Sequence, residues 1–392
     1  MTAAVVHGDV AAGFEPVREA FAQRLKEVGD GGAAFAAVVE DKTVADLWAG
    51  RAGQEPWRRE TRAVWHAGTK GFSAIVVARL VDQGVIDVDA PVAKYWPEFA
   101  AAGKADITVA QVLSHRSGVI TIPGYAEFMK PNGQGWDKTE EIVRRLASAK
   151  PAWPPGTAHG YHGLTFVWLV GEIVRRATGK TLGTVLREQI TTPLGLELDL
   201  GTPSDRQRLL APPVPCNDPL PEVLTSKLKD PSTLLSQAFL AVDGEDFHTT
   251  AHVLDSQPHL LEAELPYGAT STARAAAFLW GALANGGRRG SVQVLSPKTL
   301  KLFTTETSTG RDLVVGMNSR RGLGFSLAVP PDGFHPWGPH SETFGHTGLG
   351  IQFGFADPVS HLGVGFIRSH YSWRSQLGKD LVDTLYSCVG HV

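Results

Sequence analysis

Apolar residues at helical spacing mark the first helix of the chain and its most hydrophobic one. The spacing of Val17 and Phe21 predicts an amphipathic helix over residues 17–29. Residues 72–81 are apolar almost all round, which is typical of a helix that is buried on every side. Gly84 follows this stretch and is a common end signal, so we expect the buried helix to stop there.

Strand-like patterns lie at the two ends of the chain, and helical patterns lie between them. Residues 34–40 and 43–49 flank Asp41-Lys42 and predict a β-hairpin with a tight turn. Short apolar stretches bounded by turn residues predict strands over 322–329, 351–356 and 362–368. Helical spacing predicts further helices over 166–177, 272–284 and 376–388.

This arrangement predicts an α/β plus α fold. We expect one antiparallel sheet, flanked by helices and assembled from both ends of the chain, with an inserted helical subdomain. The predicted α/β domain comprises residues 14–107 together with 270–392, and the helical subdomain spans 108–269. A cleft between two such units is a natural place for an active site.

Composition narrows the class of protein and of partner. The chain has 392 residues, 43% hydrophobic and 20% charged, which is ordinary for a soluble globular protein of about two structural units. Its 37 basic and 40 acidic residues leave a net charge of −3, so we expect neither nucleic acid nor a membrane as a partner. No secretory signal and no long apolar run are seen, so a cytoplasmic location is predicted. Cys216 and Cys388 are expected to be buried free thiols.

The first segment with candidate catalytic residues lies at the start of the buried helix. Its sequence is Trp65-His66-Ala67-Gly68-Thr69-Lys70-Gly71-Phe72. Residues 67 and 70 are three positions apart, so they share one face of a helix. Burial would lower the pKa of the Lys70 amine and make it a proton acceptor near neutral pH. The alternative is an ordinary surface lysine at a helix start.

Two further segments add weaker signals. Tyr161-His162-Gly163 precedes the helix at 166–177, and a tyrosine beside a lysine cation can act as a general base because the cation favours the phenolate. The segment His346-Thr347-Gly348 lies before an apolar strand, where small residues let a ligand approach backbone N–H groups. Taken alone, these segments also fit a packing tyrosine and a glycine-rich turn.

Together, and in this order, the three segments resemble those of the β-lactamase-like serine hydrolases. That family carries Ser-x-x-Lys, then Tyr-x-Asn or a variant, then a Lys-Thr-Gly or His-Thr-Gly strand. The chain is most similar to the carboxylesterases that share the fold of class C β-lactamases and D-alanyl-D-alanine peptidases. Supporting matches are Leu113-Ser114-His115-Arg116-Ser117-Gly118, Asp87-Val88-Asp89-Ala90-Pro91 and Pro193-Leu194-Gly195-Leu196.

The resemblance implies roles for particular residues. The nucleophile position is residue 67, with Lys70 and Tyr161 as catalytic partners. The backbone N–H groups of residue 67 and Leu349 would form the oxyanion hole. The residues expected to line the substrate site are His162, His346, Thr347, Gly348, Trp337, Trp153 and Tyr125. No metal ligand and no cofactor are implied.

Three positions depart from the family pattern. Gly163 stands where penicillin-recognising enzymes usually have asparagine, and His346 stands where many have lysine. Both variants resemble the esterase branch and argue against β-lactamase activity. Ala67 stands at the serine position and offers no nucleophile. Because Lys70 and Tyr161 are retained, we favour an engineered serine-to-alanine change over a natural pseudoenzyme.

The expected function is therefore acyl transfer of the esterase or amidase type on a small ester or amide, blocked here by Ala67. One alternative is a transacylase that passes the acyl group to an amine or alcohol in secondary metabolism. A second is a binding protein that keeps a hydrolase fold without chemistry. The 14 histidines raise a metalloenzyme as a third, but His-Glu-x-x-His spacing is missing from the sequence.

Overall fold

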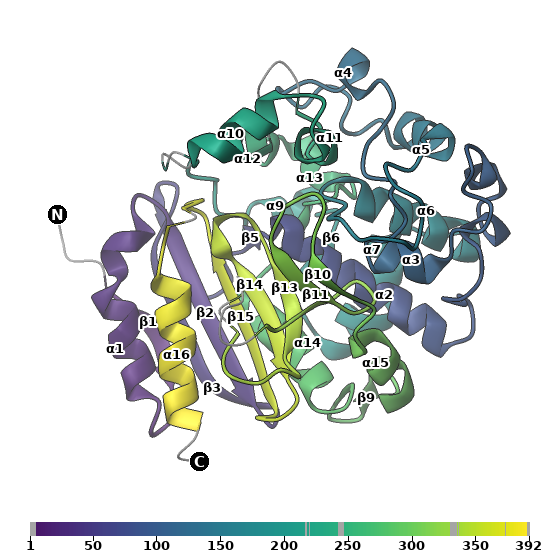
Figure 1. The fold of residues 1–392 in the computed structure, drawn as a ribbon. Helices are drawn as coiled ribbons and strands as arrows, with labels where there is room; N and C mark the ends of the chain where they lie inside the picture. Colours follow the sequence, from purple (N-terminus) through teal and green to yellow (C-terminus); the bar gives the residue numbers. More distant parts are fainter. Residues whose placement is uncertain are drawn as a thin grey trace.

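A large antiparallel sheet built from both ends of the chain forms the frame of the molecule (Figure 1). The computed structural model describes residues 5–215, 218, 220–241, 247–329, 335, 337–372 and 374–389. Nine strands follow one another across the sheet, and β4 (Glu55–Pro56) pairs with the second of them. In spatial order they are β1 (His7–Val10), β3 (Lys42–Ala52), β2 (Gly32–Val39), β15 (Leu362–Arg368), β14 (Phe353–Asp357), β13 (Phe344–Thr347), β12 (Ser326–Leu327), β11 (Asn318–Arg321) and β10 (Ser308–Arg311).

The two ends of the chain meet where β2 pairs with β15. The pairing is antiparallel and runs from Leu362 opposite Val39 to Arg368 opposite Ala33. Both strands are almost continuously apolar, because helices cover both faces of the sheet here. The predicted fold class, a helix-flanked antiparallel sheet, is confirmed.

The β2–β3 hairpin turns one residue earlier than its sequence predicts. Glu40 and Asp41 occupy the turn, with φ of 47° and 64°. A two-residue hairpin turn of this kind needs positive φ at both central residues, and aspartate tolerates that conformation better than most residues. The expected turn at Asp41-Lys42 is therefore wrong by one position, because Lys42 already belongs to β3.

Helices cover the two faces of the sheet with separate apolar cores. α1 (Glu15–Gln23) and α16 (Leu377–Val389) pack on one face, while α2 (Thr69–Asp82) and α14 (Ala273–Ala284) pack on the other (Figure 1). The first helix is shorter than predicted, because Arg24 leaves the helical conformation. A 3₁₀ turn, η1 (Leu25–Val28), continues the chain and keeps Val28 buried.

Glycines set how closely α14 lies on the sheet. A Cβ added to Gly363 of β15 would lie 2.1 Å from the backbone nitrogen of Gly281 in α14. Real Cβ atoms do not approach backbone so closely, so glycine is required for this packing. The glycine of β15 therefore fixes the distance between the helix and the sheet.

A block of short helices and small strands occupies the middle of the chain. It contains α3 (Val109–Leu113), α4 (Tyr125–Phe128), α5 (Thr139–Ser148), α6 (Thr165–Thr178), α7 (Leu182–Leu186), α8 (Thr192–Leu194), α9 (Ser204–Gln207), α10 (Glu222–Lys229), α11 (Leu234–Ala238), α12 (Phe247–Leu254) and α13 (Pro258–Glu262). A three-stranded sheet of β5 (Ala63–Val64), β7 (Ala269–Ser271) and β6 (Leu198–Leu200) lies beside α2. The hairpin β8 (Arg288–Arg289) and β9 (Val292–Gln293) and helix α15 (Pro297–Thr304) lead back to the main sheet. The division of the chain into two domains stays a prediction.

Two smaller expectations concern the cysteines and membrane-spanning helices. Cys388 is a buried free thiol, as expected, whereas Cys216 lies outside the described residues. Within the ranges given above, every helix is too short or too polar to cross a membrane.

Substitution of Gly363 tests the role of the glycine contact. We expect Gly363→Ala to lower the free energy of unfolding by about 1–3 kcal/mol, because the added methyl would push α14 off the sheet. Gly171→Ala is the matched control, since a Cβ there meets only Leu182 Cδ1 at 3.4 Å and alanine favours the interior of α6 by about 1 kcal/mol. Urea unfolding measures both variants. Equal stability of the two would show that close approach of α14 is not required.

Candidate active site

The start of α2 carries the first two residues of the site. Ala67 lies in a 3₁₀ turn, η2 (His66–Gly68), which leads directly into α2. Lys70 is the second residue of α2, and its side chain is only 1% exposed. Ala67 is partly exposed, whereas its neighbours His66 and Gly68 are buried. The alternative of a surface lysine at a helix start is therefore wrong.

Tyr161 reaches the same place from the loop before α6. The Lys70 Nζ atom lies 4.9 Å from the centroid of the Tyr161 ring. The backbone N–H of Tyr161 donates to the Asp312 Oδ1 atom at 3.0 Å, which anchors the loop to the segment between β10 and β11. The fold thus brings together two side chains that are 91 positions apart in the numbering of the chain.

Arg321 also reaches this place, and no sequence pattern predicted it. Its guanidinium carbon lies 5.1 Å from the Tyr161 ring centroid, and its Nη2 atom lies 3.4 Å from Asp312 Oδ2. The side chain is 7% exposed. No local signal distinguishes Arg321 from Arg320 beside it, because only the course of β11 decides which of the two points into the site.

Burial changes the acid–base character of both predicted partners. Desolvation, helped by the nearby Arg321 cation, lowers the pKa of Lys70 to about 7. Desolvation raises the pKa of Tyr161, even though the Arg321 cation opposes that shift. The expected stabilisation of a Tyr161 phenolate is therefore wrong: the phenol stays protonated, and the Lys70 amine is the group that is half deprotonated near neutral pH.

The end of strand β13 lies against the turn that contains residue 67, the first of the two predicted oxyanion-hole residues. A Cβ on Gly348 would lie 2.2 Å from the Trp65 carbonyl oxygen, so only glycine lets the strand end approach the turn at residue 67. Gly71 of α2 likewise lies under the His346 Cβ, which an added methyl would meet at 3.2 Å. Leu349 follows Gly348 and is partly exposed, as Ala67 is. Their joint role as an oxyanion hole stays a prediction.

The residues of β13 divide between the two faces of the sheet. His346 faces α2 and the Tyr161 ring, with the two ring centroids 6.4 Å apart. Its Nδ1 atom bonds the Thr347 carbonyl at 2.9 Å, so Nδ1 carries the proton and Nε2 is an acceptor. That buried Nε2 atom has no hydrogen-bond partner among the residues that the structure describes, and desolvation holds the pKa of His346 well below its ordinary value. His346 therefore offers a ligand one unoccupied acceptor.

The structure places Thr347 and Trp337 away from the catalytic pair. The Thr347 hydroxyl pairs with His335 Nδ1 at 2.7 Å, and Trp337 belongs to the apolar core under α1 and α16. Successive residues of a strand point to opposite faces, so Thr347 points away when His346 points in. Trp337 as a wall of the substrate site is therefore contradicted by its position on the other face of the sheet.

The remaining predicted substrate contacts, His162, Trp153 and Tyr125, each contact other groups of the protein. His162 bonds the Ser117 hydroxyl at 2.7 Å and the Gly160 carbonyl at 2.8 Å, so both ring nitrogens are occupied. Trp153 packs edge-on against His162, with ring centroids 6.1 Å apart. The Tyr125 hydroxyl donates to the Ala241 carbonyl at 2.8 Å. Of these residues, Trp153 is best placed to support a wall near Tyr161, because both join the same apolar cluster.

A buried network under residue 67 was also missed. The His66 Nε2 atom bonds Asp255 Oδ2 at 2.8 Å, and the Tyr371 hydroxyl donates to the same oxygen at 2.6 Å. Gln352 donates to the Val64 carbonyl at 2.9 Å and lies 3.3 Å from the His66 Nδ1 atom. His66 has φ of 49°, an uncommon conformation for a residue with a side chain. This network holds the turn that presents Ala67.

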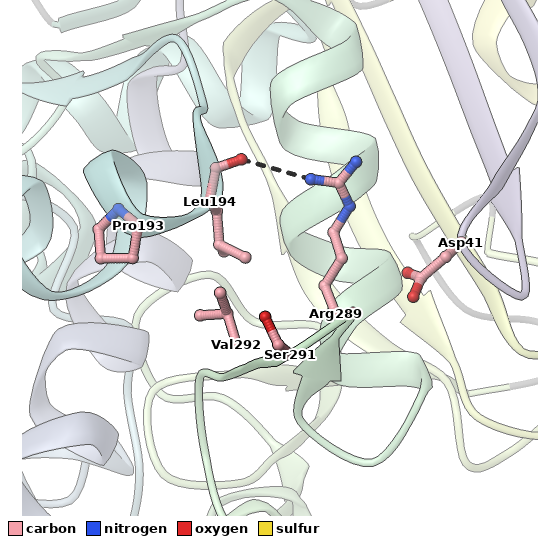
Figure 2. Close-up of a pocket in the computed structure, with 7 residues that line it drawn as sticks. Asp41, Pro193, Leu194, Arg289, Ser291 and Val292 are labelled. Atoms are coloured by element: carbon pink, nitrogen blue, oxygen red, sulfur yellow. Dashed lines mark hydrogen bonds between the residues drawn. The ribbon is translucent and has the colours of Figure 1, made fainter.

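Two hollows lie elsewhere on the molecule. One of about 330 Å³ is formed near the β2–β3 and β8–β9 turns and is shown in Figure 2. It is lined by Asp41, Pro193, Leu194, Arg289, Gly290, Ser291 and Val292. There the Arg289 guanidinium donates to the Leu194 carbonyl at 3.3 Å and stacks 3.8 Å from the Phe278 ring centroid. The second, of about 470 Å³, lies at Trp168 between α5, α6 and α7. Neither is lined by Lys70 or Tyr161.

Metal ligation was the remaining alternative chemistry. Where the structure describes the chain, it brings no three His, Cys, Asp or Glu side chains close enough to hold a metal ion. The histidines nearest the catalytic pair instead bond other protein groups, as His115 does when its Nδ1 atom accepts from the His162 N–H at 3.0 Å. The expectation that no cofactor is needed stays a prediction.

Comparison with known proteins places this geometry in a family. The family model described as "Beta-lactamase" matches residues 17–372. The chain belongs to the beta-lactamase family. Esterase/beta-lactamase LipL of Mycobacterium tuberculosis is 34% identical over 368 residues, which cover 91% of this chain and 81% of that protein.

Solved structures of this beta-lactamase family agree over nearly the whole length. A family VIII carboxylesterase superposes with a TM-score of 0.86 at 34% identity, covering 98% of this chain and 99% of that one. EstA from Arthrobacter nitroguajacolicus Rue61a gives a TM-score of 0.81 at 30% identity, with 97% and 98% covered. The resemblance to β-lactamase-like esterases that the sequence motifs predict is therefore confirmed.

The buried Lys70 amine should make stability depend on pH. An ordinary lysine has a pKa of about 10.4, so between about pH 10 and pH 7 the unfolded chain holds a proton that folded Lys70 lacks. We therefore expect Lys70 to reduce the free energy of unfolding by about 1.4 kcal/mol for each pH unit below about 10, levelling off below pH 7. Lys70→Met should remove this loss and raise the melting temperature more at pH 7 than at pH 10.

Thermal unfolding between pH 6 and pH 10 measures the effect. Lys298→Met, on the exposed surface of α15, is the matched control and should leave the pH dependence unchanged. A gain in stability for Lys70→Met that is the same at every pH would contradict a deprotonated amine at neutral pH.

Proposed function

We propose that this site is built for acyl transfer through an acyl-enzyme on a small ester or amide, and that Ala67 blocks it at the first step. The chain belongs to a family of serine hydrolases, and its relatives include proteins named as an esterase and a carboxylesterase. The observation that carries the proposal is the convergence of the Lys70 amine and the Tyr161 ring, 4.9 Å apart, beside residue 67.

The first step needs a hydroxyl at residue 67 and a base to take its proton. Because the pKa of Lys70 is about 7, its neutral amine is suited to accept that proton as the hydroxyl oxygen attacks the substrate carbonyl. The backbone N–H groups of residue 67 and Leu349 would stabilise the oxyanion. The Tyr161 phenol, which stays protonated, is suited to donate to the leaving group.

The apolar surroundings favour an uncharged acyl or alcohol group. Tyr161 packs at the edge of an apolar cluster that also includes Trp153, and the Phe239 ring lies 6.2 Å from the Tyr161 ring. Desolvated walls of this kind bind apolar groups and exclude charged ones. The unoccupied acceptor His346 Nε2 adds one polar contact for a hydroxyl or amide N–H.

Two alternatives use the same residues. A transacylase would deliver the acyl group to an amine or alcohol instead of water, and the apolar walls that limit water near Tyr161 favour this variant. A binding protein would hold the ligand with no reaction, as Ala67 by itself predicts. A small-molecule partner, a cytoplasmic location and the absence of nucleic-acid and membrane partners remain part of the proposal.

Restoring the hydroxyl tests the function directly. We expect Ala67→Ser to hydrolyse p-nitrophenyl butyrate at least about 10³-fold faster than the parent chain, because the loss of a serine nucleophile costs more than this in serine hydrolases. The same variant should be labelled by a fluorophosphonate. Spectrophotometry and intact-protein mass spectrometry measure the two effects.

Ala67→Ser combined with Lys70→Met is the matched control and should lose the gain in both assays. Faster ester consumption in the presence of an added amine or alcohol, with the acylated acceptor as product, would favour the transacylase. Binding of the ester by both forms with no turnover and no label in Ala67→Ser would contradict acyl transfer and leave the binding protein.

The pKa of Lys70 also predicts a pH profile for Ala67→Ser. The value of kcat/KM should rise as pH increases through about 7, because the amine must lose its proton before it can act as base. A buffer series from pH 5 to pH 9 gives the midpoint. A midpoint near 10, where an ordinary lysine titrates, would contradict the burial of the base.

A further inference from the structure

The chain with Ala67 keeps a nucleophile of a different kind in the site. We propose that Lys70 itself attacks aldehydes and ketones, so that this protein forms an imine with small apolar carbonyl compounds. This goes beyond the proposed acyl transfer, which uses Lys70 only as a base. The reaction needs alanine, or another residue without a nucleophilic or hydrogen-bonding group, at position 67. A serine hydroxyl there would react with the carbonyl compound and form a hydrogen bond to the amine.

The position of the Lys70 amine supports this activity. It lies at the start of an apolar helix, 1% exposed, and the Lys70 amine and the Arg321 guanidinium lie 4.9 Å and 5.1 Å from the centroid of the Tyr161 ring. Imine-forming lysines in enzymes are desolvated or placed beside a second cation, and Lys70 has both features. The pKa of about 7 follows from them. At pH 7 about half of the Lys70 amines are neutral, against about 1 in 2,500 for an ordinary lysine.

The alanine at residue 67 affects both the access of a carbonyl compound and the lone pair of the Lys70 amine. Ala67 and Lys70 are three residues apart and share a face at the start of α2, and Ala67 is partly exposed while Lys70 is not. A methyl group neither donates nor accepts a hydrogen bond, so it leaves the amine lone pair on its side unengaged. Ala67, Tyr161 and Leu349 are each partly exposed, so the proposal places the entry of a carbonyl compound at these three residues.

The reaction balances with groups that are present. The Lys70 nitrogen forms a bond to the carbonyl carbon while the C=O π electrons move to oxygen, and one N–H proton is transferred to that oxygen to give a carbinolamine. The nitrogen lone pair then forms the C=N bond as the C–O bond breaks, and the second N–H proton replaces the one that the departing hydroxyl takes up, so the products are a Lys70 imine and one water. Tyr161 is suited to supply the proton to the departing oxygen, because burial raises the pKa of its phenol and keeps it protonated.

The other ionisable groups around the amine do not block this step. Histidines 115, 162 and 346 surround the Tyr161 ring or the amine, and desolvation lowers the pKa of each. They are therefore neutral at pH 7, and Arg321 is the charged residue that faces the pair, with Asp312 as its counter-ion. An uncharged apolar carbonyl compound fits this environment better than a carboxylate, because the Arg321 charge is already paired.

Reductive trapping tests the proposal on the unaltered chain. Incubation with limiting benzaldehyde and sodium cyanoborohydride at pH 7 converts an imine into a stable benzyl amine, because hydride adds to the C=N carbon. Peptide mapping by mass spectrometry should find the label on Lys70 at an initial rate about 10-fold or more above that of exposed lysines such as Lys298. Label spread over exposed lysines, with Lys70 unmodified, would overturn the proposal.

Lys70→Arg is the matched control, because it keeps a cation but has no primary amine. It should lose the site-specific label while exposed lysines react as before, and circular dichroism would show that it is folded. Tyr161→Phe should slow trapping at Lys70 without moving the label elsewhere. Equal labelling of the site-derived peptide in Lys70→Arg would also contradict an imine at this residue.

The result of the imine-trapping experiment is independent of the result of the acyl-transfer test. If Ala67→Ser gains esterase activity but the parent chain shows no label on Lys70, acyl transfer stands and the imine proposal fails. If Lys70 is labelled and Ala67→Ser gains nothing, the imine proposal stands and acyl transfer fails.

Discussion

The burial of one lysine amine shapes the chemistry of this molecule. Lys70 lies inside an apolar helix whose other residues anchor the core between the sheet and the helical block. A protonated amine in that position pays a desolvation cost, and the positive charge of Arg321 adds to that cost instead of relieving it. The amine is therefore easier to deprotonate than an ordinary lysine. Both proposed activities use this single consequence of burial.

The rest of the site exists because segments from different parts of the chain meet at the start of α2. Tyr161 comes from the helical block, His346 comes from β13, and Leu349 comes from the 3₁₀ turn that follows β13. Glycines at the contact points make the meeting close enough, since Gly348 lets β13 touch the turn at residue 67. A side chain at that position would clash with the Trp65 carbonyl and move the end of β13 away from the turn, whatever stood at residue 67.

A buried hydrogen-bonded network also supports the turn that contains residue 67. His66, Asp255 and Gln352 form a buried hydrogen-bonded network that ties the turn to β14 and to the segment after α12. Such networks are costly to disrupt, because a buried polar group that loses its partner is left desolvated. The hydrogen-bonded framework around residue 67 is therefore present, although residue 67 itself carries a methyl group.

The sequence by itself determined the fold class and the main buried helices, and it predicted the two side chains that the fold brings together, Lys70 and Tyr161. Apolar spacing marked α2, α6 and α16 to within a few residues, and motif order pointed to Lys70 and Tyr161 before any contact was known. Local patterns suffice there because helical and strand periods, and the chemistry of a residue type, can be read along the chain.

Only the tertiary structure decided which groups share the site and in which protonation state. Arg321 and His66 carry no local signal, Trp337 lies on the other face of the sheet, and burial raises the pKa of the Tyr161 phenol. These properties depend on which segments pack together and on how much water they exclude. Neither is encoded in any short stretch of residues, because desolvation and strand facing are properties of the assembled core.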